Sequence, residues 1–409
     1  MSVLVPRRIA FPLAAVTMAS LLAAAAAPSP LYPVYQQLWG FSSLTLTLIF
    51  AVYVFALLAA LLTVGSVSDH VGRRPVVIGA LLLLAVSMAL FIVADGVSGL
   101  LVARVVQGLA TGAATGTLSA MIVDFQPSQR TGSTVASSAP TLGLAAGAVL
   151  AGALVQYAFA PRYLVYWVLL VLDVALAAAV WFLPEATGER RLSWRAVAAS
   201  LRPSAGVPRP LRSLFFSQVP ALASTWALAG LYLSLGPSVV GHELHVDNHL
   251  LAGVVLAAMF GSGAVGSASM NALPEAARRP TGYLTLGAGV VLSVIGAFDG
   301  SLVVYLVASA IAGFGFGATF QNAMGAIAVA TPPAERGQVF ATTFVVSYTA
   351  FSVPALVAGL AVQEYGLRDT LLGYAVLEIA LVVTASGGDR ARRRAESGEL
   401  DEARAQEAG

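Results

Sequence analysis

Long apolar runs separated by short polar stretches fill most of the 409-residue sequence. Each run is close to the roughly 20 residues that an α-helix needs to cross a bilayer. We therefore predict an all-α polytopic membrane protein with twelve transmembrane helices. Their approximate limits are Ile9–Ala27, Leu44–Val64, Val76–Ala94, Ser98–Val123, Ser133–Tyr157, Tyr163–Leu183, Ser213–Gly236, His249–Met270, Thr281–Phe298, Ser301–Ala330, Val339–Val362 and Thr370–Ser386.

The longest polar connection lies between the sixth and seventh predicted helices and divides them into two groups. We expect an N-terminal six-helix bundle at 1–183, a central cytoplasmic loop at 184–212, a C-terminal six-helix bundle at 213–386 and a charged cytoplasmic tail at 387–409. Arginines in short loops mark the cytoplasmic side. With both termini inside, only Arg162 and Arg368 lie in outer loops. The pattern predicts a multi-pass protein of the inner (cytoplasmic) membrane with both termini in the cytoplasm.

Composition excludes several other classes of protein. Hydrophobic residues make up 58% of the sequence and charged residues only 10%, against about half and a quarter in soluble domains. Disulfides and thiolate metal sites are excluded because the chain has no cysteine. The four histidines show no metal-ligand pattern, so no metal is expected, and a net charge of +2 suggests no nucleic-acid partner.

The two predicted bundles carry related sequences, which indicates an internal duplication. Arg73-Arg74-Pro75 recurs as Arg278-Arg279-Pro280, an offset of 205 (278 − 73). Further matches at nearly the same offset are Pro127-x2-Arg130 with Pro333-x2-Arg336, Ala151-Gly152-x3-Gln156 with Ala358-Gly359-x3-Gln363, Arg162 with Arg368, and Asp173 with Glu378. Arginines that recur in cytoplasmic loops explain two of these pairs but not the glutamine or the buried acid. Parallel duplicated halves are a transporter architecture with the substrate site between them.

A compact polar loop between the second and third predicted helices carries the most specific motif. It reads Gly65-x3-Asp69-x2-Gly72-Arg73-Arg74. Glycines allow the tight backbone that two adjacent spans need, and the arginines mark the cytoplasmic side. The loop resembles the motif between the second and third helices of major facilitator superfamily transporters, and the resemblance covers nearly the whole chain.

This resemblance implies a gating latch formed by Gly65, Asp69, Gly72, Arg73, Arg74 and Asp124. Asp69 would cap a helix start in the other half, where a carboxylate suits the positive end of the helix dipole. Arg73 would pair with Asp124, and the network would stabilise the outward-facing state. The second-half copy lacks the aspartate and the glycines, so we expect one complete latch. The alternative is an ordinary positively charged turn.

The fourth predicted span contains Arg104-x2-Gln107-Gly108. Arg104 lies about 9 Å inside the outer end of the span at 1.5 Å per residue, where a charge is costly unless it faces protein or water. The segment resembles the family's fourth-helix motif, which is associated with proton coupling. A structural arginine bonded to backbone carbonyls is the alternative.

The fifth predicted span contains Gly143, Gly147 and Gly152. Their spacing resembles the glycine-rich motif of the superfamily's twelve-helix drug–proton antiporters, although Ala148 replaces the usual proline and Ala151 a glycine. The resemblance implies export. Close packing of small residues against another helix would produce the same pattern.

Two acids lie near the middle of predicted spans, Asp173 roughly 15 Å and Glu378 roughly 14 Å along their helices. An acid inside the membrane is costly and can carry a proton, so both are proton-coupling candidates together with Arg104. The family's architecture places these two helices away from the central cavity. A purely structural role is therefore the alternative.

The resemblance also implies a substrate cavity lined by the first, fourth, seventh and tenth spans and their symmetry mates. Its candidates are polar or aromatic residues deep in the spans, for each of which helix packing is the alternative: Tyr53, Gln107, Thr111, Gln218, Trp226, Tyr232, Gln321, Asn322 and Tyr348. A mostly apolar pocket of this kind suits an amphipathic organic compound better than a sugar or a phosphate.

Together these features predict a secondary active transporter and not an enzyme, since no nucleophile–base–acid set or cofactor loop stands out. We expect a monomeric, proton-coupled efflux antiporter for small amphipathic compounds or drugs, as in multidrug resistance. Its partners would be the substrate, protons and the bilayer, with the proton gradient as energy source and no cofactor. The alternatives are a proton-coupled uptake permease for a small organic nutrient and a channel or receptor, which the duplicated halves disfavour.

Overall fold

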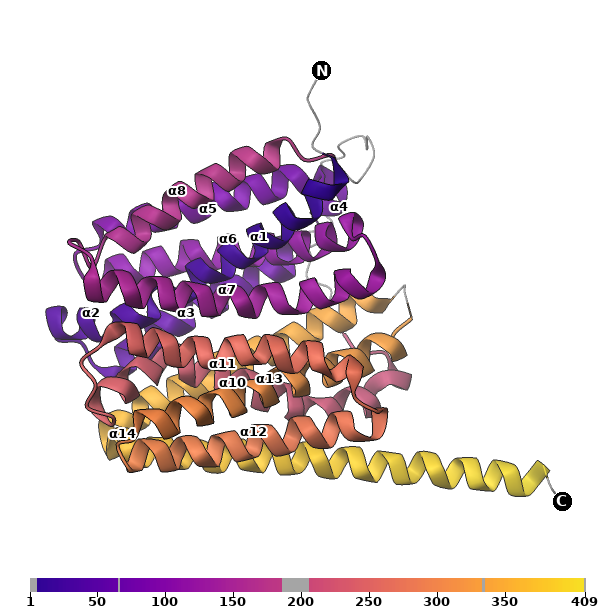
Figure 1. Ribbon diagram of the computed structural model, residues 1–409. Helices are drawn as coiled ribbons and strands as arrows, with labels where there is room; N and C mark the ends of the chain where they lie inside the picture. The colour runs from indigo at the N-terminus through magenta and orange to yellow at the C-terminus, as the bar shows by residue number, and fades with distance from the viewer. Residues whose placement is uncertain (1–5, 65–66, 186–205, 333–334, 408–409) are drawn as a thin grey trace.

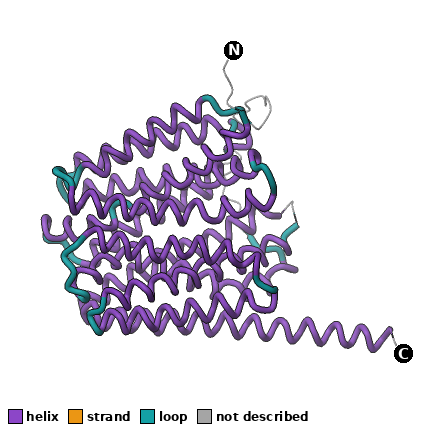
Figure 2. The backbone as a smooth tube through the Cα atoms, viewed as in Figure 1, coloured by secondary structure: helices purple, strands orange, loops and turns teal. Residues whose placement is uncertain are grey.

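The computed structural model describes residues 6–64, 67–185, 206–332 and 335–407, and this part of the chain is helical and contains no strand (Figure 1, Figure 2). Eleven of its segments are long and apolar enough to cross a membrane. The last of them, Arg336–Arg392, is 57 residues long. It is broken at Gly366, whose φ of 80° and ψ of 169° are not helical, so two helices meet there. Glycine adopts this positive φ at no steric cost.

The first group of helices contains all the elements before the central connection. They are α1 (Arg7–Ala26), η1 (Ser29–Leu31), α2 (Tyr32–Trp39), α3 (Ser43–Val64), α4 (Ser68–Val71), α5 (Arg73–Val93), α6 (Val97–Phe125), α7 (Gln129–Tyr157) and α8 (Leu164–Trp181). The first span is interrupted between α1 and α2 by a turn and the short η1, where Pro28 and Pro30 supply no backbone N–H for α-helical hydrogen bonds.

The second group follows the central connection, most of which lies outside the described residues. Its elements are η2 (Arg209–Leu211), α10 (Arg212–His242), α11 (His249–Ser269), η3 (Met270–Ala272), α12 (Glu275–Phe298), α13 (Leu302–Ala330) and α14 (Arg336–Glu407). In Figure 1 the two groups form two layers, indigo to magenta above and orange to yellow below.

Three helices of the second group extend well beyond their predicted limits. One is α12, which begins at Glu275 and not at Thr281. The seventh span was predicted to end at Gly236, but α10 continues through Pro237 to His242. Prolines are tolerated in membrane helices because neighbouring groups satisfy the freed backbone. The last span was predicted to end at Ser386, but α14 remains helical through the charged tail to Glu407.

The two groups meet along α7 with α11 and along α3 with α14. Glycines allow the close approach. A Cβ atom on Gly253 of α11 would lie 2.3 Å from the Ala148 oxygen, and one on Gly359 of α14 would lie 2.0 Å from Thr47 Oγ1. We call the end of the molecule that holds Arg73 and Arg279 the arginine-rich end. The contacts above lie toward the other end of the helices, which we call the opposite end.

Candidate substrate-binding site

A cavity of about 230 Å³ lies between the two groups of helices. Its wall is mainly apolar, and its polar side chains are largely hydroxyls; no charged side chain belongs to the described lining. The aromatic lining residues are Phe50, Tyr53, Trp226, Phe260, Phe316, Phe320, Phe344, Tyr348 and Phe351. Both groups contribute, so a movement of one group against the other changes the shape of this cavity.

Trp226 of α10 is the centre of the aromatic wall. Its ring centroid lies 5.0 Å from that of Tyr348, 5.3 Å from Phe351 and 5.7 Å from Phe320. Such distances are typical of favourable aromatic pairs. The indole Nε1 is buried and has no hydrogen-bond partner among the described residues. A buried N–H without a partner costs about 1–3 kcal/mol, so a ligand with an acceptor oxygen would gain by meeting it.

Three of the nine predicted cavity residues line this cavity: Tyr53, Trp226 and Tyr348. The other six are Gln107, Thr111, Gln218, Tyr232, Gln321 and Asn322, and they lie outside its wall. The amides are bonded within the protein: Gln107 Nε2 donates to the Ala24 oxygen at 2.8 Å, and Asn322 Nδ2 to the Arg278 oxygen at 3.0 Å. Buried amides need such partners, which is why depth in a span did not predict exposure to the cavity.

Most of the aromatic wall was missing from the sequence prediction. Phenylalanines such as Phe50 and Phe351, whose rings lie 4.9 Å apart across the two groups, carry no polar atom that distinguishes them from packing residues. Nothing in the sequence alone separated them from the remaining phenylalanines of the chain.

Arg104 is almost fully buried, with 1% of its surface exposed. It forms hydrogen bonds with residues on both sides of the interruption between α1 and α2. Its Nη1 donates to the Ala25 oxygen at 3.2 Å and to Gln107 Oε1 at 2.6 Å, and its Nη2 donates to the Tyr32 hydroxyl. The guanidinium also lies 5.2 Å from the ring of Tyr53, which lines the cavity. Arg104 therefore lies behind the cavity wall, in contact with Tyr53 and the backbone of α1.

The predicted latch is partly visible at the arginine-rich end. Arg73 and Asp124 form an ion pair. Gly72 has a φ of 104°, a backbone conformation that favours glycine. Arg74 Nη1 donates to the oxygens of Trp181 and Leu183 at 3.2 and 3.3 Å. Gly65 and the side chain of Asp69 lie outside the described residues.

Glu185 was not predicted as part of this network. Its carboxylate accepts from the backbone N–H groups of Arg73 at 2.8 Å and Arg74 at 3.2 Å, at the start of α5. A carboxylate is stabilised at this position by the unpaired N–H groups and the helix dipole. The sequence prediction gave this kind of role to Asp69, toward the other half.

The second group has a related cluster around Asp389. Its carboxylate accepts from Arg279 Nη1 at 2.6 Å, Tyr283 OH at 2.7 Å and Gln218 Nε2 at 3.3 Å. Asp389 lies 204 residues after Glu185 (389 − 185). That offset, close to those of the other repeats, was the signal that could have found both acids.

The three motif glycines of α7 all allow close backbone contacts. Cβ atoms on Gly143 and Gly147 would lie 2.2 and 2.1 Å from the oxygens of Ala19 and Ala23 on α1. One on Gly152 would lie 2.5 Å from the His249 oxygen, across the boundary between the two groups. Next to it, Gln156 Oε1 accepts from the His249 N–H at 2.9 Å. Of the three glycines, Gly152 is therefore the one that brings the two groups into contact near the opposite end.

Asp173 on α8 and Glu378 on α14 are completely buried. None of their four carboxyl oxygens has a hydrogen-bond partner among the described residues. Both lie outside the lining of the central cavity. The structure therefore keeps these acids, as candidates for proton binding, apart from the aromatic site.

Comparisons with known proteins agree with this architecture. The family model of the Major Facilitator Superfamily matches residues 13–355. A solved bacterial homolog of the human lysosomal transporter Spinster, in an inward-facing and unoccupied conformation, superposes with a TM-score of 0.70 at 13% identity, covering 94% of this chain and 97% of that one. The human organic anion transporter MFSD10 (TETRAN) superposes with a TM-score of 0.62 at 18% identity, covering 93% and 100%. Comparison with curated proteins gave no match.

The chain belongs to the Major Facilitator Superfamily. It is a multi-pass membrane protein and a secondary transporter, not an enzyme.

Proposed function

We propose that this protein is a proton-coupled exporter of small amphipathic organic compounds, working by alternating access. The observation that carries the proposal is the aromatic, uncharged lining of the cavity between the two groups of helices. An apolar site with a few hydroxyls and one unpaired indole N–H binds compounds that are mainly hydrophobic. Sugars and phosphates require a denser set of polar or cationic partners.

The proposal includes the finer topology predicted from the sequence. Twelve spans form two six-helix bundles in the inner membrane, with the break at Gly366 separating the eleventh span from the twelfth. Both termini lie in the cytoplasm in this proposal, which the arginine-rich end supports under the positive-inside rule. In this state the glycine contacts close the outer end.

The test uses inside-out vesicles with an acidified lumen, a pH-sensitive dye and a panel of amphipathic compounds. Exchange of a compound for lumenal protons raises the lumenal pH. Vesicles without the protein should show no response, and vesicles with Trp226→Ala should show a weaker one. If folded wild-type protein gives no response to any compound, export is refuted, and the nutrient-uptake alternative is then tested with small polar solutes.

A further inference from the structure

The carboxyl group of Glu378 lies in a part of the C-terminal group that the central cavity does not reach. Both of its oxygens are buried and have no hydrogen-bond partner among the described residues. Ser224 on α10 lies beside the carboxyl but forms no regular hydrogen bond with it. An unpaired carboxylate ion in such surroundings costs several kcal/mol. The neutral, protonated acid is therefore the stable form in this conformation.

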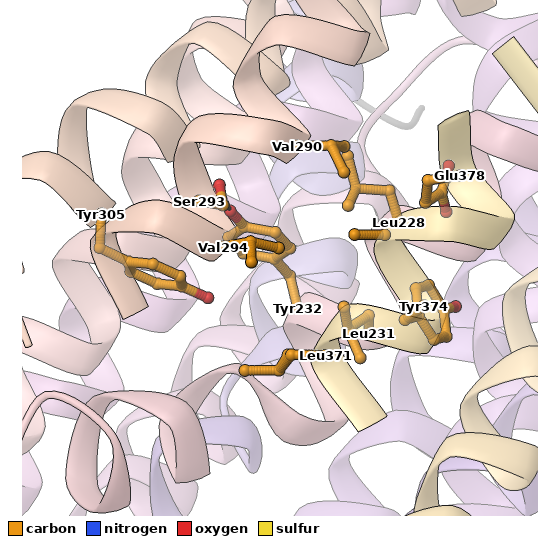
Figure 3. A pocket seen from close by; sticks show the side chains of 11 residues that line it. Leu228, Leu231, Tyr232, Val290, Ser293, Val294, Tyr305, Leu371, Tyr374 and Glu378 are labelled. Carbon is orange, nitrogen blue, oxygen red and sulfur yellow. Dashed lines mark hydrogen bonds between the residues drawn. The ribbon is translucent and has the colours of Figure 1, made fainter. Parts of the chain in front are cut away.

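A small cavity of about 30 Å³ connects Glu378 with hydroxyl groups of three other helices. Figure 3 shows Tyr232 and Ser293 in the middle of it, Tyr305 on one side, and Tyr374 and Glu378 on the other. One water needs about 10–15 Å³ measured in this way, so about two waters fit. The other lining residues of this small cavity are apolar, so its polar groups are the hydroxyls and the Glu378 carboxyl.

Three hydroxyl groups form a hydrogen-bonded cluster between Glu378 and the opposite end of the molecule. Tyr232 OH lies 3.1 Å from Ser293 Oγ and 2.9 Å from Ser309 Oγ. Ser309 in turn donates to the backbone carbonyl oxygen of Tyr305 near the start of α13, where the cluster ends. A hydroxyl both donates and accepts, so these three groups are able to pass a proton among themselves, and water in the small cavity would join them to Glu378.

The groups that face Glu378 do not stabilise its negative charge. The titratable ones are Tyr374 on its own helix, Tyr232 on α10 and Tyr305 on α13, and α12 contributes the neutral Ser293. Tyr374 OH donates to the Ala227 oxygen at 2.7 Å and so points its proton away from the acid. No arginine or histidine belongs to the described lining. Ionisation of Glu378 therefore requires water to enter, as a change of conformation would allow.

We infer that Glu378 is the proton-binding site of the C-terminal half, reached from the opposite end through the hydroxyls of Tyr232, Ser293 and Ser309. The carboxylate takes one proton from water and becomes neutral; on release the proton returns to water and the carboxylate remains. Compound and proton occupy separate sites, so they compete through conformation and not through direct displacement. The link to export rests on the proposed function, whereas proton binding by Glu378 does not.

The N-terminal half contains a matching pair that serves as a control. Asp173 is buried without a hydrogen-bond partner, and Ser20 on α1 lies beside it. Ser20 and Ser224 are 204 residues apart (224 − 20). The features that distinguish Glu378 are the small cavity and the hydroxyl groups beside it, because Asp173 does not line that cavity.

The test is infrared spectroscopy of the full-length protein in lipid nanodiscs at neutral pH. Protonated carboxyl groups absorb in a region separate from carboxylates. Glu378→Gln should remove one component of this absorption, and Asp173→Asn should leave that component in place. Tyr232→Phe should keep the component but slow its shift on transfer to deuterated water severalfold. If Glu378→Gln does not fold, Ser224→Ala serves instead and should move the frequency of the same component.

The second readout is proton movement in the vesicles described above. Loss of the Glu378 component together with loss of compound-evoked proton movement supports the inference. Absorption that is unchanged in Glu378→Gln overturns proton binding by Glu378. Undiminished proton movement in that variant, with the component lost, overturns its link to export. A compound panel that is silent with the wild type counts against export alone, because the infrared readout needs no substrate.

Discussion

The substitution Gly152→Ala should disfavour closure of the two halves at the opposite end. The new Cβ would lie 2.5 Å from the His249 oxygen and 3.1 Å from Leu250 Cα, against 3.4–4 Å for an ordinary contact. Both of these atoms belong to the backbone of α11, so no side chain can turn aside. The helices must separate to accommodate the methyl group.

The magnitude follows from the cost of overpacking, which is about 1–3 kcal/mol for an added methyl group in a tight site. That energy corresponds to a change of about 5–150-fold in a conformational equilibrium. The gain in helix propensity on replacing glycine, about 0.5–1 kcal/mol, applies equally to both conformations and cancels. The closed state shown here should therefore lose population by about 5–150-fold.

Electron paramagnetic resonance measures this change as the distance between two spin labels. The labels attach only at introduced cysteines, because the chain has no native cysteine. Phe159→Cys and Tyr365→Cys are suitable sites, since these residues are 91% and 72% exposed and lie near the opposite end of the two halves. Longer label distances should gain population in Gly152→Ala relative to the unsubstituted, doubly labelled protein. The matched control is Gly79→Ala, where a Cβ atom meets nothing within 4 Å.

An unchanged distance distribution in Gly152→Ala would refute the reasoning. It would mean that α7 and α11 adjust locally and that Gly152 does not determine closure. A shift of the same size in Gly79→Ala would refute it as well, since the effect would then come from replacing any helical glycine.

Four further predictions concern other parts of the molecule. Asp389→Asn should lower the melting temperature, because hydrogen bonds to a charged group contribute about 1.5–3 kcal/mol each, whereas the exposed Asp299→Asn should not. Trp226→Phe should keep the ring contacts but weaken binding of acceptor-bearing compounds by about 2–10-fold, as loss of one hydrogen bond of about 0.5–1.5 kcal/mol implies; equal affinity would remove the indole N–H from recognition. Arg104→Ala should uncouple or stop transport in the vesicle assay, and unchanged coupling there would make Arg104 structural. Asp69→Asn should slow transport without loss of expression, and wild-type turnover would count against the latch.

The sequence predicted the membrane spans well because each depends on a local property, the length of an apolar run. The start of α11 at His249 and the end of α7 at Tyr157 were both predicted. The end of α10 was not, because a Gly-Pro pair that stops a helix in water does not stop one packed in a bundle.

The polar network was harder to predict, because it depends on which groups meet in space. The expected pair of Arg73 and Asp124 is present. Glu185 and Asp389 lie just after predicted spans and were counted with loop and tail charges. Their roles follow from the buried N–H groups and the arginines that approach them, which no local pattern displays. The aromatic wall escaped prediction for a related reason: a phenylalanine that faces a cavity and one that faces a helix look the same in sequence.

Asp389 also has a mechanical consequence for the end of the chain. The acid fixes α14 to Gln218 on α10 and to Arg279 and Tyr283 on α12, so the helix beyond it is attached to a rigid base. Residues 389–407 then extend for roughly 27 Å at the helical rise, and Figure 1 shows them projecting past the other helices. A small tilt of the C-terminal half therefore displaces the far end of this helical segment by a much larger distance. A fluorophore placed near its tip would turn each transport cycle into a visible displacement, without any label in the membrane.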